Sequence, residues 1–450
     1  MAAVSFSSSS HAPSYSMLSE EPPNTSQPPS TWLSPNRGAK LLLHPLPKSP
    51  SKLSYPSKLP DWYSNLHRQL RDLSCSNQEE PTHPLDYKSI RATVEHVMGI
   101  QDDNQSLLLL KLLSEFPLFG SQEIFFCVLN ALRQRHSNLN TYFSDLDLEE
   151  DGIHPSFTPA ALAQLLHFFC EQFRLPDVLD VTYTSALPSL VLEMIKAPEG
   201  TFHGWAVAND LISDDPHVVP AFALKKGGVL HLFFFDSIGH NFSENMNERR
   251  IPIVLTQVFD ELRNKEKARE GLKIYSYQPQ RQHALAGCTV FTLLDLKNLV
   301  EMHQASNGDL IDFYHSQPPE LQPEVANHKL RRKTPLDFYE MRTLPPQMMK
   351  STQSYTELGR YQSRPPEMMS TPMAFRYSAE GELVSKPLNL EELRLRVEEK
   401  KRIDSRDKPK NLYVEQKQMQ MTVYLLGVYF GMPAIDPKNI FTPNMARRLF

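Results

Sequence analysis

The chain has 450 residues, of which 40% are hydrophobic, so it can bury one large core or two modest ones. Its net charge of −5 gives no general reason to expect nucleic-acid binding. The 4 cysteines show no regular spacing, which argues against a disulfide scaffold or a metal site and is typical of a reducing compartment.

Residues 1–60 have a composition that does not form a packed core. Serine and proline dominate them, and Glu20 and Glu21 are their only acidic residues. We expect a disordered leader of the kind used by secretion machines that thread unfolded chains, although an ordinary flexible tail has the same composition. We expect no transmembrane segment, because no apolar run approaches the roughly 20 residues that cross a bilayer. We also expect no Sec-type signal peptide, because the N-terminus lacks a charged region followed by an apolar one.

Helical patterns begin at about residue 84, where we place the start of a catalytic part, residues 84–315. Apolar residues recur three and four positions apart in three segments, with Ser121 and Thr158 as plausible N-caps. These predicted helices are Tyr87–Ile100, Ser121–Arg135 and Pro159–Phe173. Leu187–Ile195 predicts a short buried segment. Cys127 and Cys170 lie inside apolar helical runs and are expected to be unreactive core thiols.

A β-hairpin is the clearest prediction in the middle of the chain. Residues 217–226 and 229–237 are rich in β-branched and aromatic side chains, and they meet at Gly227-Gly228, a strong hairpin turn signal. An earlier strand is expected around Trp205, which we interpret as a core residue. Residues 251–267 predict a helix that follows the hairpin.

His217 and Asp236 are expected to lie close together on this hairpin. Pairing the two strands about the turn makes them diagonal neighbours on one face, roughly 7–8 Å apart, which long or aromatic side chains can bridge. A carboxylate beside an imidazole fixes its tautomer and stabilises the protonated form. We therefore predict a base, His217, oriented by Asp236; the plainer interpretation is that two polar residues bound their strands.

Cys288 is the predicted nucleophile. Residues 273–277 predict a strand, and a polar turn then leads into a helical pattern that begins at Cys288. The positive end of a helix dipole favours the thiolate form of a cysteine at this place. Gln282 lies on the turn six residues earlier, where its amide can donate to an oxyanion alongside the backbone N–H of Cys288. Considered alone, Gln282 also fits an exposed loop residue.

The C-terminal part, residues 316–450, is less regular. Residues 316–385 are rich in proline and methionine. An amphipathic, charged helix is predicted for residues 388–402, and a more apolar helix for residues 413–430.

The order His217, Asp236, Gln282, Cys288 resembles the ubiquitin-like-protease clan of cysteine enzymes. Within that clan the chain most resembles the YopJ-like family of bacterial effector acetyltransferases, since the frame H-x-x-x-A-x-x-x-x-x-G-G-x-L-x-L-x-F-F-D from His217 to Asp236 matches that family.

A later block supports the same resemblance. Leu344-Pro345 followed by Lys350-Ser351-Thr352-Gln353-Ser354 is similar to the family's L-P dipeptide and K-H-x-Q-S-like run, with serine in place of the histidine.

The chain departs from the resembled family beside the nucleophile. The family usually has an acidic residue before the cysteine and a glycine after it, whereas this chain has Gly287 and Thr289. Threonine is stiffer than glycine at the oxyanion turn, so we expect this departure to affect the rate and the oxyanion geometry more than the fold. The acid is Asp236 where relatives often carry Glu.

The resemblance implies an α/β fold, in which a cysteine-protease-like mixed sheet is flanked by helices and the N- and C-terminal flanks build a helical regulatory region. It also implies a secreted effector of the host cell cytoplasm, without need of nucleic acid. This enzyme would transfer acetyl from acetyl-CoA to Ser, Thr or Lys of host target proteins through an acetyl-cysteine.

In the resembled family, inositol hexakisphosphate binds the regulatory region and so builds the acetyl-CoA site. Such a polyanion needs clustered Lys and Arg side chains, and no glycine-rich phosphate loop is present. The local candidates are Arg331, Arg332, Lys333 and Lys350, with Lys400, Lys401 and Arg402 as a second cluster. A basic run is also typical of an ordinary solvated face.

Two other functions stay open at the level of sequence. The same site chemistry would serve a ubiquitin-like-protein isopeptidase, as in the wider clan, but a protease needs no acetyl-CoA site. Gly287 and Thr289 motivate the other alternative, a catalytically weak effector that only binds host proteins.

Overall fold

Every residue described below belongs to one unit of the chain, residues 40–450. The computed structural model describes residues 46–49, 52–53, 58–75, 87–116, 121–148, 152–210, 217–239, 261–262, 271–277, 279–282, 287–304, 309–325, 337–349, 351–352, 375–377, 383–385, 389–390 and 412–432. The predicted leader therefore lies almost wholly outside the described residues, and the boundaries at 84 and 316 stay predictions.

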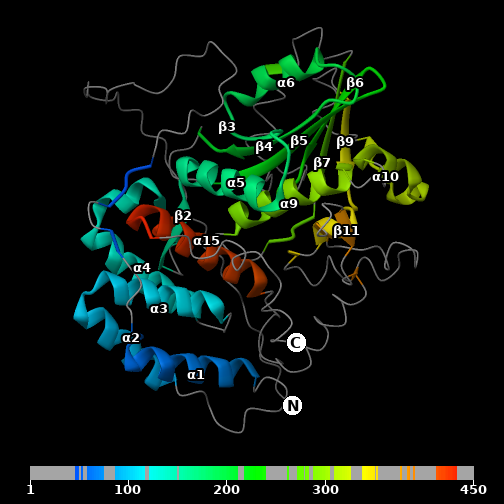
Figure 1. Ribbon diagram of the computed structural model, residues 1–450. Coiled ribbons are helices and arrows are strands. Elements are labelled where there is room, and N and C mark those ends of the chain that lie inside the picture. Colours follow the sequence, from blue (N-terminus) through cyan, green and yellow to red (C-terminus); the bar gives the residue numbers. More distant parts are fainter. Residues whose placement is uncertain are drawn as a thin grey trace, which may run out of the picture. The chain divides into compact units, whose positions relative to one another are not determined.

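A seven-stranded mixed sheet forms the centre of the fold, in the order β3-β4-β5-β6-β7-β9-β8 (Figure 1). The strands are β3 Leu179–Tyr183, β4 Phe202–Ala208, β5 Val218–Lys226, β6 Val229–Phe234, β7 Leu272–Tyr277, β8 Glu324–Val325 and β9 Asp337–Met341. β5 runs antiparallel to both β4 and β6, whereas β6, β7 and β9 are parallel. The amino end of β5 therefore lies at the same edge of the sheet as the carboxyl ends of β6 and β7.

The predicted hairpin is present as β5 and β6. Its register runs from Lys226 opposite Val229 to Ala221 opposite Phe234, symmetric about the glycine pair as expected. Gly227 and Gly228 have φ values of 63° and 76°, which only glycine adopts readily, and such a turn matches the twist of the strands.

Helices cover both faces of the sheet. α5 (Pro159–Phe173) and α9 (Cys288–Gln304) lie on one face, and α6 (Leu187–Ile195) lies on the other (Figure 1). Side chains of β6 alternate between the two cores: Phe233 belongs to the core on the α9 side, and Leu232 and Phe234 belong to the core on the α6 side. The expected fold class, a mixed sheet flanked by helices, is confirmed.

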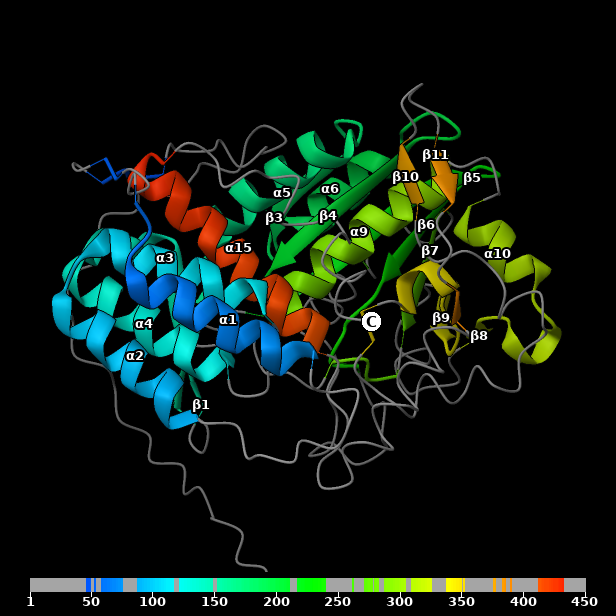
Figure 2. The same ribbon diagram turned by 60° about the horizontal axis from the view of Figure 1, so that its bottom comes forward.

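A helical region is built from both flanks of the chain. Its helices are α1 Asp61–Cys75, α2 Tyr87–Ile100, α3 Asp103–Glu115, α4 Ser121–Arg135 and α15 Leu412–Phe430. α15 contacts α3, α4, α5 and α9, and Figure 2 shows it beside α3. The backbone N–H of Ser49 donates to the carbonyl of Tyr429 at 2.7 Å, so the N- and C-terminal flanks meet directly.

Shorter elements complete the described part. They are η2 Ser137–Thr141, β1 Phe143–Leu148, β2 Gly152–Phe157, α10 Leu310–Ser316, η4 Pro319–Leu321, η5 Pro346–Met349, β10 Phe375–Tyr377 and β11 Leu383–Ser385. Within the described helices, none is both long and apolar enough to span a membrane.

Most predicted helices are present with the expected bounds. The Thr158 side chain accepts a hydrogen bond from the backbone N–H of Ala161, as an N-cap does. Only residues 261–262 of the predicted helix 251–267, and residues 389–390 of the one at 388–402, are described. Three helices of the described part were not predicted, α1, α3 and α10. The leucine run of α3 is buried nearly all round, so it lacks the polar face that makes a helical period visible.

Candidate active site

Three neighbouring strands and one helix bring the predicted site residues to one edge of the sheet. His217 directly precedes β5, Asp236 follows the end of β6, and Gln282 lies between β7 and α9. Cys288 is the first residue of α9, and that helix packs against β5. The hydroxyl of Thr292 donates to the carbonyl of Val218 at 3.2 Å, which fixes α9 against the start of β5.

The predicted contact between His217 and Asp236 is present. His217 Nε2 lies 3.0 Å from Asp236 Oδ1, and the Asp236 side chain is buried. The same oxygen accepts a hydrogen bond from the backbone N–H of Ile238 at 3.0 Å, which holds the carboxylate in its orientation. An acid held in this way can fix the tautomer of the imidazole.

The Cys288 thiol lies within hydrogen-bonding reach of the His217 ring, and the cysteine is buried. Burial alone lowers the pKa of His217. Three effects outweigh burial and hold the pKa of His217 well above 6.5. They are the negative charge of Asp236, its hydrogen bond to the ring, and the interaction of the ring with Cys288. The raised pKa favours the imidazolium, the form that stabilises a thiolate beside it.

Gln282 is buried, so its interpretation as an exposed loop residue is wrong. The Ser237 hydroxyl donates to Gln282 Oε1 at 2.6 Å, and the backbone N–H of Gln282 donates to the Ser237 carbonyl at 2.8 Å. Because Oε1 faces Ser237, the amide Nε2 points away from it. A Cβ added at Gly287 would lie 3.5 Å from that Nε2, so the amide lies beside the residue that precedes Cys288.

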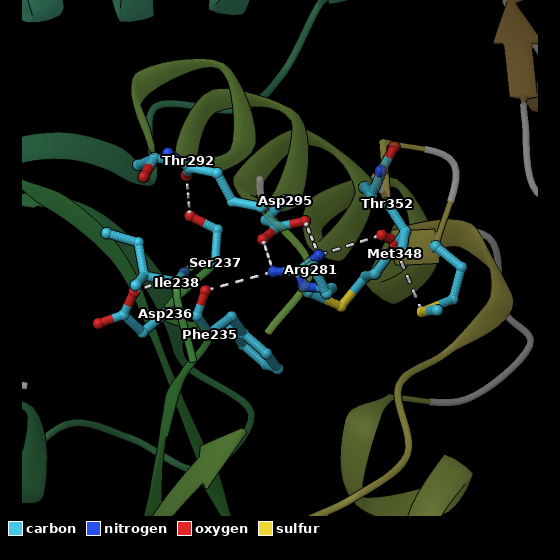
Figure 3. Close-up of polar contacts among 12 residues, drawn as sticks. Phe235, Asp236, Ser237, Ile238, Arg281, Thr292, Asp295, Met348 and Thr352 are labelled. Atoms are coloured by element: carbon cyan, nitrogen blue, oxygen red, sulfur yellow. Dashed lines mark hydrogen bonds and ion pairs between the residues drawn. The ribbon is translucent and has the colours of Figure 1, made fainter. Parts of the chain in front are cut away.

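A buried ion pair next to Gln282 was not predicted from the sequence. The guanidinium of Arg281 binds the carboxylate of Asp295, and both side chains are completely buried (Figure 3). The signal was available: Asp295 interrupts the apolar pattern of α9, and a carboxylate buried there needs a cationic or hydrogen-bonding partner. Ser237 was missed as well, and only its position after Asp236 pointed to it.

Gly287 has a packing reason in this chain. A Cβ there would lie 3.0 Å from Val414 Cγ1 of α15 and 3.4 Å from the side-chain carbon Cδ of Gln282. The acidic residue that the resembled family usually has at this place would therefore need α15 or Gln282 to move.

The later sequence block also lies beside the site. η5 packs against α9, where the Asn298 side-chain amide donates to the Gln347 carbonyl at 3.0 Å. Ser351 and Thr352 are buried. Lys350 and the predicted basic residues Arg331, Arg332 and Lys333 lie outside the described residues, as do Lys400, Lys401 and Arg402. In the described part, no cluster of His, Cys, Asp and Glu fits a metal ion.

Cys127 and Cys170 differ from each other in exposure. Cys127 is exposed on α4, so its prediction as a core thiol is wrong: it occupies a turn of the helix that faces away from the core. Cys170 is half-buried, and burial raises the pKa of its thiol to about 11, which makes it a poor nucleophile at neutral pH. Trp205 is buried in β4, as predicted.

A cysteine at the start of a helix that packs on a mixed sheet, with a histidine and an acid from the neighbouring strands, is the arrangement of the cysteine-protease-like α/β class. The family described as YopJ Serine/Threonine acetyltransferase matches residues 184–422. This is more than half of the chain, and the chain belongs to that family.

Solved structures show more distant similarity. "AvrA delL154 with IP6, CoA" is 15% identical, with 68% of this chain and 98% of that chain covered at a TM-score of 0.37. "Crystal structure of HopZ1a in complex with IP6 and CoA" is 12% identical, with 61% and 84% covered at a TM-score of 0.38. A de-sumoylating protease is 9% identical, with 38% and 74% covered at a TM-score of 0.20. No curated protein matches the sequence.

Proposed function

We propose that this protein is a secreted effector that acts in the host cell cytoplasm and transfers acetyl from acetyl-CoA to Ser, Thr or Lys of host proteins. The acetyl group is carried on Cys288, with His217 as base and Asp236 as its orienting acid. The observation that carries the proposal is the 3.0 Å contact between His217 Nε2 and Asp236 Oδ1, with the Cys288 thiol in reach of the same ring.

The first half-reaction loads the cysteine. His217 takes the proton of the Cys288 thiol, and the sulfur attacks the acetyl carbonyl of acetyl-CoA. A new sulfur–carbon bond forms, the bond between carbonyl and CoA sulfur breaks, and CoA leaves with the proton held by His217. The pKa of His217, raised by Asp236, favours the protonated state that this step requires.

The second half-reaction transfers the acetyl group from Cys288 to the target protein. A hydroxyl or amine of the target protein gives its proton to His217 and attacks the acetyl carbonyl, and Cys288 leaves as the thiolate. At both stages the carbonyl oxygen becomes an oxyanion. Gln282 Nε2 and the backbone N–H of Cys288 are the donors we assign to it, since the Gln282 amide is oriented by Ser237 and lies beside Gly287.

Acetyl-CoA as donor and inositol hexakisphosphate as activator follow from membership of the family. Two buried hydroxyls fit a polar substrate near the site: within the described residues, Thr289 Oγ1 next to Cys288 and Ser351 Oγ next to Lys350 have no hydrogen-bond partner. Arg331, Arg332, Lys333 and Lys350 are our candidates for phosphate, since their charges suit it.

The test is transfer of a labelled acetyl group to the enzyme. Purified protein is incubated with labelled acetyl-CoA, with and without inositol hexakisphosphate, beside Cys288→Ala. Cys127→Ala is the matched control, because it removes an exposed thiol from α4. We expect label on wild type and Cys127→Ala, more with inositol hexakisphosphate, and none on Cys288→Ala. Unlabelled protein that instead cleaves a ubiquitin-like conjugate would contradict the proposal and support the isopeptidase.

A further inference from the structure

Arg281 is one of the largest completely buried side chains in the part of the chain that the structure describes, and it directly precedes Gln282. Its Nη1 donates to Asp295 Oδ1 at 3.0 Å, and its Nη2 pairs with Asp295 Oδ2. Asp295 lies on α9, two turns after Cys288. The ion pair therefore joins the Gln282 loop to the helix that begins at the predicted nucleophile.

The same guanidinium reaches two further elements. Nη2 donates to the carbonyl of Phe235 at 3.3 Å, and Nη1 donates to the carbonyl of Met348 at 3.1 Å (Figure 3). Phe235 directly precedes Asp236, and Met348 belongs to η5. The backbone N–H of Arg281 also donates to the carbonyl of Ser237 at 2.9 Å. One side chain thus contacts the segments that carry Asp236 and Cys288 and the block before Lys350.

We propose that Arg281 and Asp295 are positioning residues, which set the distances among Asp236, Gln282 and Cys288 without touching the substrate. This inference rests on the proposed function of the site. The geometry supports it because Nη1 and Nη2 of the guanidinium donate to groups from three different segments of the chain. A planar group with fixed donors couples the relative placement of these segments.

Stability alone is a weak reason for such a pair. Removing two charges from water is costly, and replacing a buried ion pair by apolar residues of similar volume is often neutral or stabilising. Arg281 already lies on apolar surroundings, with its guanidinium 5.6 Å from the centre of the Tyr277 ring and 5.3 Å from that of Phe291. An apolar pair would therefore fill this space, but it would lose the hydrogen bonds to Phe235 and Met348.

The deciding variant is Arg281→Met with Asp295→Leu, which removes both charges together. Single replacements are a poor test, because each leaves one buried partner unpaired, and burial already raises the pKa of Asp295 against the effect of Arg281. We expect the double variant to unfold at the wild-type temperature or above, while kcat for acetyl transfer falls about 100-fold, since small misplacements at a site cost that much. KM should change little.

A control pair is available on the same helix. Lys297 Nζ lies 2.6 Å from Glu301 Oε2, and both side chains are largely buried. Both residues lie further along α9 from Cys288 than Asp295 does. Lys297→Met with Glu301→Leu should leave kcat within about twofold of wild type. Arg281→Lys keeps the positive charge but loses the planar, two-pronged guanidinium. It should therefore keep the ion pair with Asp295 but retain only part of the wild-type kcat.

A second readout does not depend on acetyl transfer. Iodoacetamide labelling of Cys288, followed by peptide mass spectrometry across pH, reports how His217 and the thiol are placed, with Cys127 as an internal reference in each sample. We expect the pH profile of Cys288 to shift in the double variant, while that of Cys127 stays unchanged. If wild type transfers no acetyl, this profile still tests the positioning role. Wild-type kcat and labelling in a stable double variant, or equal losses in the Lys297 control, would overturn it.

Discussion

At the scale of single residues, the site is defined by what surrounds His217. Burial disfavours the charged form of His217, whereas Asp236 and Cys288 favour it. The pKa of His217 therefore depends on two partners, and each can be removed by substitution. Gln282 depends in the same way on Ser237.

Asp236→Asn should lower the pKa of His217. The change removes the largest stabiliser of the imidazolium, and burial then dominates. NMR titration of labelled histidine, with His217→Gln to assign the signal, measures the shift. Because the pKa of His217 is raised in the folded protein, its protonation stabilises the fold fully below about pH 6.5, as long as Asp236 is ionised. This contribution is lost as pH rises through the pKa that His217 has in the folded state. Asp180→Asn, which removes the partner of His203, is the matched control and should leave the His217 titration unchanged.

Ser237→Ala should lower kcat about fivefold by releasing the Gln282 amide, since one such hydrogen bond contributes about 1 kcal/mol. In a Gln282→Ala background the same change should have no further effect, because nothing is left to orient. Steady-state kinetics of wild type, the two single variants and the double variant complete this double-mutant cycle. Ser316→Ala, exposed on α10, is the control. Fully additive losses would mean that Ser237 acts by another route.

At the scale of elements, α15 packs against the residue that precedes the predicted nucleophile. Its first turn places Val414 against Gly287, so a helix from the C-terminal flank contacts the residue next to Cys288. This contact gives the helical region a direct physical route to the site.

Gly287→Ala should slow acetyl transfer and loosen α15. The added methyl group meets Val414 Cγ1 at 3.0 Å, and overpacking of this kind costs about 1–3 kcal/mol. Val414→Ala should restore the rate in the double variant, and hydrogen exchange of α15 measures its loosening. Gly99→Ala on α2, whose added methyl would have no atom within 4 Å, should leave the rate unchanged. A fully active Gly287→Ala would show that the contact is easily relieved.

At the scale of the whole molecule, acid should destabilise the fold through His231. Burial, followed by the nearby charge of Lys273, lowers the pKa of His231 to about 4. The neutral form stabilises the folded state above pH 6.5, and this contribution, about 3 kcal/mol at most, is lost as pH falls towards 4. His231→Phe keeps the ring stack on Tyr275 and should flatten the denaturation profile between these pH values. The control His96→Gln, which replaces an exposed histidine, should leave the denaturation profile unchanged.

Much of the fold was visible in the sequence because its signals are local. The glycine pair of the hairpin, the periodic helices and the start of α9 at Cys288 depend on neighbours along the chain, and so did the approach of His217 to Asp236. The Arg281 ion pair and the Val414 contact join residues that are far apart in sequence or lie in different elements. Their partners are set by packing, which no local pattern encodes.

The most direct test of the central claim is to find the acetyl group on Cys288 itself. The enzyme is mixed with labelled acetyl-CoA and inositol hexakisphosphate, quenched in acid before the acceptor is added, and digested for peptide mass spectrometry. The account predicts an acetyl thioester on the Cys288 peptide that disappears when an acceptor is added before the quench. Acetylated acceptor formed by an enzyme that never carries acetyl on Cys288, or by Cys288→Ala at the wild-type rate, would contradict it.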